Sequence, residues 1–128
     1  MKYNLSHIKT VKLAESGVTV PVQVFEGFVI NAKIIGVDSK KSAQLIREFS
    51  ERRKEIDQSD TAAIRKLDAE FISEHVVEWD FKDAEGAVVP PDAEVFQSLA
   101  EEAPYVLEAF DRQIYNRRNF ISLEKKKS

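Results

Sequence analysis

The apolar positions of this chain change their spacing along its length, and the spacing predicts strands first and helices afterwards. Residues 8–13 alternate between apolar and polar side chains, and Val18–Phe25 is rich in valine at nearly the same period. After a Glu26-Gly27 turn, residues 28–35 extend the pattern. Because Pro21 cannot donate a backbone hydrogen bond, we expect its strand either to lie at an edge of the sheet or to begin after the proline. These segments predict a small N-terminal antiparallel sheet of two or three strands.

Helical spacing begins at an Asp38-Ser39 N-cap and continues to about residue 53, and we expect this first helix to pack one apolar stripe against the sheet. A second helix is predicted from Ser59 or Asp60, a third from Asp92, and a fourth with Pro104 in its first turn. The apolar faces of these helices are formed, in chain order, by Ala43, Leu45, Ile46 and Phe49, by Ile64, Leu67, Phe71 and Ile72, by Val95, Phe96 and Leu99, and by Val106, Leu107, Phe110 and Ile114.

A small sheet packed with about four short helices is a single α+β domain, which we place at residues 1–122, followed by a disordered basic tail at residues 123–128. The chain has 128 residues and no cysteine, so packing must stabilise it without disulfides. No apolar run approaches the roughly 20 residues that span a bilayer, and the first residues lack the apolar centre of a signal peptide. We therefore expect a cytoplasmic protein with no membrane partner.

The single tryptophan, Trp79, lies in an apolar segment that favours a strand and that an acidic turn around Asp83 and Gly86 closes. Two interpretations are open for this side chain. As a hot spot for a partner, the indole would be exposed. As a core anchor, it would lie on one strand face with Val77 and Phe81, and the apolar neighbours favour this second interpretation.

The sequence contains no recognisable catalytic motif: it has no glycine-rich phosphate loop, no nucleophile elbow and no HExxH. His75 has Glu74 and Asp80 nearby and could serve as a base or a metal ligand, but a histidine at a helix C-terminus more often caps backbone carbonyls. The acidic turn lacks the spacing of a calcium loop. We therefore expect no enzyme, no catalytic residue, no cofactor and no metal site.

Two basic stretches are candidates for contact with nucleic acid, one in the first helix and one near the end of the chain. They contain Arg47, Arg52, Arg53 and Lys54, and then Arg112, Arg117 and Arg118 with Tyr115 and Phe120. Acidic residues intervene throughout, and the formal net charge of the chain is -3. A solvated helix face with pairs such as Glu48 and Arg52 accounts for the same residues, so we expect no nucleic-acid partner.

The run from residue 71 to residue 120 resembles the second half of the small tail assembly chaperones encoded by long-tailed bacteriophages and prophages. The likeness consists of a tryptophan in HVVEWDF, the acidic turn with its glycine, a short Val-Pro tract and a last helix of the type LEAFDRQIYNRRNF. The strands that end at Val37-Asp38-Ser39, before a charged helix, fit the first half of such proteins. The pattern is one of spacing and residue type and contains no catalytic motif.

Such chaperones coat the helical tape-measure protein, keep it soluble and help to bring tail-tube subunits to it. The resemblance therefore implies a non-enzymatic protein whose partners are the tape-measure protein and the tail-tube protein, and it leaves a homo-oligomer open. Apolar grooves between short helices would cover the stripes of a tape-measure chain. We expect such grooves between the last two helices, and the candidate partner-binding residues are Trp79, Phe96, Leu99, Val106 and Phe110.

Two alternatives stay open: a structural phage component, such as a neck, tail-completion or minor tail protein, and a small nucleic-acid-binding regulator. The resemblance also extends to a programmed ribosomal frameshift that makes a longer form of the protein. An adenine-rich slippery run can encode Lys125-Lys126-Lys127, although a solvated basic tail explains the same residues.

Overall fold

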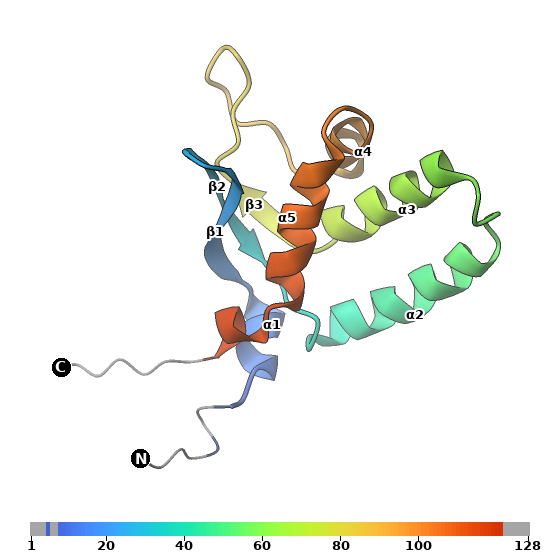
Figure 1. Cartoon of the computed structure of the whole chain (residues 1–128). Helices are drawn as coiled ribbons and strands as arrows, with labels where there is room; N and C mark the ends of the chain where they lie inside the picture. The colour runs from blue at the N-terminus through green and yellow to red at the C-terminus, as the bar shows by residue number, and fades with distance from the viewer. Residues whose placement is uncertain (1–4, 6–7, 122–128) are drawn as a thin grey trace.

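The sheet joins two strands near the start of the chain to one from its middle, as Figure 1 shows. The structure is a computed structural model, and it describes residue 5 and residues 8–121. β1 (Val18–Phe25) pairs antiparallel with β2 (Phe28–Ile34), and β2 pairs antiparallel with β3 (Val76–Trp79). Gly27 makes the turn between β1 and β2 with a φ of 88°, which a side chain would disfavour. The order β1-β2-β3 confirms the edge position of Pro21.

The strand expected at residues 8–13 is wrong, because part of this segment is helical. α1 (Val11–Ser16) is a short helix whose Ala14 is buried. The Ala14 carbonyl accepts a hydrogen bond from the Gly36 N–H at 3.1 Å, and the Thr10 hydroxyl donates to the Asp38 carboxylate. These contacts with the segment after β2 decide the local structure, since a six-residue pattern is too short to distinguish the two periods.

Four longer helices and a final short one complete the domain, and the predicted starts of the four longer helices are confirmed. The side chains of Ser39, Asp60 and Asp92 each accept a hydrogen bond from the backbone N–H three residues later, at 3.0, 3.1 and 3.0 Å. Among the described residues, no helix combines the length and apolar character needed to cross a membrane. The elements are α2 (Lys40–Lys54), α3 (Thr61–Ser73), α4 (Ala93–Glu102), α5 (Pro104–Tyr115) and the 3-10 helix η2 (Arg117–Phe120).

The main core lies between one face of the sheet and the helices α3, α4 and α5. Trp79 is at its centre, 7% exposed, with its ring centroid 5.0 Å from that of Phe96 and 5.7 Å from that of Phe110. The core-anchor interpretation of Trp79 is confirmed. The placement of Val77 on the same face is wrong, because the β2–β3 register shifts beside it and leaves Val77 51% exposed.

The first long helix, α2, packs on α3 and not on the sheet as expected. Its Leu45 and Phe49 form a small separate cluster with Leu67 of α3, since α5 already packs against β1. Arg52 pairs with Glu70 of α3 at 2.9 Å, in place of the expected pairing with Glu48. As Figure 1 shows, α2 and α3 form a helical hairpin that extends to one side of the sheet. The expected basic tail lies outside the described residues.

Candidate partner-binding groove

The partner-binding residues predicted from the sequence lie mostly in the core. Trp79, Phe96, Val106 and Phe110 are each at most 7% exposed, and Leu99 is half-buried. Phe96 of α4 and Phe110 of α5 meet edge to face with ring centroids 5.6 Å apart. The last two helices therefore close on each other through these residues, which belong to the core and not to an open groove.

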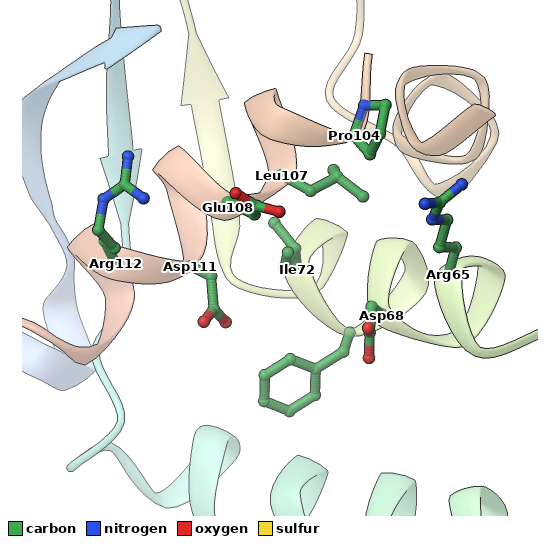
Figure 2. A pocket seen from close by; sticks show the side chains of 9 residues that line it. Arg65, Asp68, Ile72, Pro104, Leu107, Glu108, Asp111 and Arg112 are labelled. Atoms are coloured by element: carbon green, nitrogen blue, oxygen red, sulfur yellow. The ribbon is translucent and has the colours of Figure 1, made fainter. Parts of the chain in front are cut away.

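An open groove lies between α3 and α5 and continues to α2. Two hollows of about 510 and 330 Å³ share Asp68, Phe71 and Asp111, and we call them together the α2–α3–α5 groove. Figure 2 shows the part between α3 and α5. The remaining lining residues are Ile46, Phe49, Ser50 and Arg53 of α2, Arg65, Leu67 and Ile72 of α3, and Pro104, Leu107, Glu108, Arg112 and Tyr115 of α5.

The periodicity of each helix explains why these residues line one groove. On α5, Val106, Phe110 and Ile114 are turned into the main core, so the adjoining stripe at residues 104, 107, 108, 111 and 115 faces α3 and α2. On α2 the stripe is at residues 46, 49, 50 and 53. A further hollow of about 530 Å³ between α3 and α4 is lined by alanine, charged residues and one glutamine, and by no aromatic ring.

The electrostatics of the groove centre on two carboxylates. Asp68 pairs with Arg53 at 3.1 Å, whereas the half-buried Asp111 has no ion pair or side-chain hydrogen bond with any described residue. Burial raises the pKa of Asp111, the charge of Asp68 raises it further, and Arg112 opposes both effects. Burial also raises the pKa of Tyr115, and both carboxylates add to this effect. The groove is therefore locally negative at its centre.

The buried polar pair of Ser42 and His75 has a structural role. His75 Nδ1–H donates to the Phe71 carbonyl at 2.9 Å, so Nε2 accepts from the Ser42 hydroxyl at 2.8 Å. Burial lowers the pKa of His75, which keeps the ring neutral near pH 7. The expectation that His75 caps a carbonyl is confirmed. The hydrogen bond to Ser42 links α2 to the segment that follows α3. Within the described residues, no three His, Cys, Asp or Glu side chains are placed to hold a metal ion.

The two basic stretches are partly neutralised by contacts between elements. Arg52 and Arg53 pair with carboxylates of α3 at 2.9 and 3.1 Å. Arg117 donates two hydrogen bonds to Asp38, at 2.9 and 3.0 Å. These arginines are therefore less available to a phosphate backbone than the sequence alone indicates.

The groove residues that the sequence analysis missed are polar or half-exposed members of otherwise apolar helices. Asp68 follows Leu67, and Asp111 follows Phe110, so each carboxylate lies beside a core stripe. The signal was the spacing of Leu107, Asp111 and Tyr115 on a second face of α5. No protein-family model, curated protein or solved structure matches the chain.

Proposed function

We propose that this protein is a phage tail assembly chaperone, which binds the tape-measure protein and helps to recruit tail-tube subunits in the bacterial cytoplasm, without enzymatic activity. The observation that supports this proposal best is the α2–α3–α5 groove, in which helical stripes surround Phe71 and leave Ile46 38% and Tyr115 45% exposed. Grooves of this kind bind amphipathic helices, and a tape-measure chain is largely helical before the tail tube encloses it.

The size of the groove suits such a partner. Its stripe on α5 runs from Pro104 to Tyr115, which at 1.5 Å per residue is roughly 16 Å, or three turns of a bound helix. A helix in the groove would cover aromatic surface of this chain that is otherwise in contact with water. The bound helix would at the same time bury its own apolar stripe, and this burial would lower the tendency of the tape-measure protein to aggregate.

The proposal is tested by sequencing the DNA downstream of the gene for a long, helical reading frame, as expected of a tape-measure protein, and by co-expressing its product with this chain. We expect the tape-measure product to become soluble and to co-purify with this chain, and not with an unrelated small protein of similar charge. A tape-measure product that stays insoluble would contradict the proposal. Mass spectrometry of purified virions separates the structural alternative, because a chaperone leaves the particle and a tail component stays in it.

A further inference from the structure

We propose that the α2–α3–α5 groove takes a basic amphipathic helix, and that an arginine or lysine of this helix lies over the Phe71 ring with its cation between Asp68 and Asp111. The identity of the helix as part of the tape-measure protein rests on the proposed function. The chemistry of the site rests on the groove alone.

The composition of the groove centre favours a basic side chain. The residues shared by the two hollows are two carboxylates and a phenyl ring. An arginine or lysine side chain matches this combination, because its alkyl stem is apolar and its end is a cation. The ring adds a favourable interaction with the cation.

The charges of the groove are not balanced at its centre. Arg53 offsets Asp68 at 3.1 Å, whereas Asp111 and Glu108 have no ion pair with a described residue. Glu108 is exposed to water, and Asp111 is the half-buried carboxylate where the two hollows meet. In Figure 2 the carboxylates of Asp68 and Asp111 point to one side, towards α2, whereas Arg65 and Arg112 point away from that side. A neutral or acidic helix would strip water from Asp111 without replacing it by a cation, and this desolvation is costly.

The chain already contains the same recognition beside the groove, at the Phe49 ring. The Arg52 guanidinium carbon lies 4.6 Å from the centroid of the Phe49 ring, and its nitrogen pairs with Glu70 at 2.9 Å. An arginine is thus held between a phenyl ring and a carboxylate across α2 and α3. The groove offers the equivalent ring and carboxylates at Phe71, Asp68 and Asp111, with the basic side chain still to be supplied.

The shape of the groove favours a helical partner. The groove walls are stripes of α2 and α5, with α3 between them, so all its surfaces have helical spacing. A helix places its side chains at the same period, whereas an extended peptide binds best along a free strand edge. The strand edges belong to β1 and β3, which do not line the groove.

The experiment uses two synthetic amphipathic helical peptides of about 18 residues, or five turns, which differ only in one central arginine or norleucine on the apolar face. Binding is measured by nitrogen-15 NMR with the full chain as wild type, Asp111→Asn and Glu102→Gln. The Glu102→Gln change removes the same charge from the exposed end of α4, outside the groove. Because burial disfavours the charged form of Asp111, Asp111→Asn should fold as stably as the wild type, which thermal unfolding checks.

We expect the arginine peptide to shift the signals of Ile46, Phe71 and Tyr115, and the norleucine peptide to bind about tenfold more weakly. The Asp111→Asn variant should lose this difference between the peptides, and Glu102→Gln should keep it. Equal affinity for both peptides, no shift at the groove, or an unchanged preference in Asp111→Asn would overturn the proposal. Shifts of the same residues on raising protein concentration without peptide would identify a second copy as the occupant and overturn it as well.

Co-expression of the same variants separates this proposal from the proposed function. If the wild type keeps the tape-measure product soluble while it binds the two peptides equally, the groove assignment is wrong and the chaperone function stands. If the wild type fails to do so while the peptides behave as expected, the groove stands and the function is wrong.

Discussion

Replacement of Gly36 by alanine is the sharpest test of how the 3-10 helix η2 packs on the domain. A Cβ atom at this position would lie 2.9 Å from Cε2 of Phe120 and 3.0 Å from both Cδ2 and Cζ, inside the usual contact distance of about 3.5–4.0 Å. The backbone itself would accept alanine, because positive φ values occur at other glycines and not at Gly36. The cost of Gly36→Ala therefore comes from the Phe120 ring.

The magnitude follows from the confinement of that ring. Phe120 is 2% exposed and belongs to the core, so the ring cannot move without disturbing its neighbours. Overpacking of this kind costs about 1–3 kcal/mol. The lower conformational entropy of alanine in the unfolded chain returns about 0.4–1 kcal/mol. The difference between the midpoints of these two ranges is about 1.3 kcal/mol, and we expect Gly36→Ala to lower the free energy of unfolding by roughly this amount.

Urea unfolding followed by circular dichroism measures this loss, and Phe120→Leu supplies the matched background. Leucine lacks the ring atoms that crowd position 36, so Gly36→Ala should cost much less in that background. The reasoning is refuted if Gly36→Ala is within about 0.5 kcal/mol of the wild type, or if it costs the same with leucine at position 120.

Three further predictions follow from buried or charged groups. Burial lowers the pKa of His75 from 6.5, so the unfolded chain binds the proton first. The free energy of unfolding should therefore fall as the pH drops below about 6.5, by at most about 1.4 kcal/mol per pH unit. Urea unfolding of His75→Asn at several pH values should no longer show this fall. The Arg117 guanidinium lowers the pKa of Asp38 below 3.8, so the stability it adds is present above that pH and is lost as the pH falls through the lowered value. Arg117→Gln should lower the melting temperature slightly at pH 7, and the difference from the wild type should disappear in strong acid. Trp79→Phe removes the indole N–H that donates to the Val89 carbonyl. This change should lower the free energy of unfolding by about 2–3 kcal/mol, which urea unfolding followed by circular dichroism measures.

Local signals made much of the fold predictable from the sequence. The side chains of Ser39, Asp60 and Asp92 accept hydrogen bonds from the backbone three residues ahead. A short segment of sequence is therefore enough to predict where these helices begin. The burial of Trp79 was indicated by its apolar neighbours. The helix at Val11–Ser16 was missed because its structure depends on a distant hydrogen bond from Gly36.

The groove was beyond the reach of periodicity alone. The pattern of α2 shows which residues form its apolar stripe, but it does not show whether the sheet or α3 covers Leu45 and Phe49. In the same way, Asp68 and Asp111 each read as a polar residue beside a core stripe, and only the crossing of α3 and α5 brings them to one groove. The pattern along one helix therefore predicts which face is apolar, but it does not predict which element packs against that face.

The most direct test of the account is hydrogen–deuterium exchange of this chain alone and in complex with the co-expressed tape-measure product. We predict slower exchange in the complex along α2 and α5, where they line the groove, and unchanged exchange at the tip of the β1–β2 hairpin. That tip is the rival surface, because Phe25 is 55% and Val29 is 42% exposed there. Protection at the hairpin tip with no change along α2 and α5 would contradict the central claim that the groove holds the partner helix.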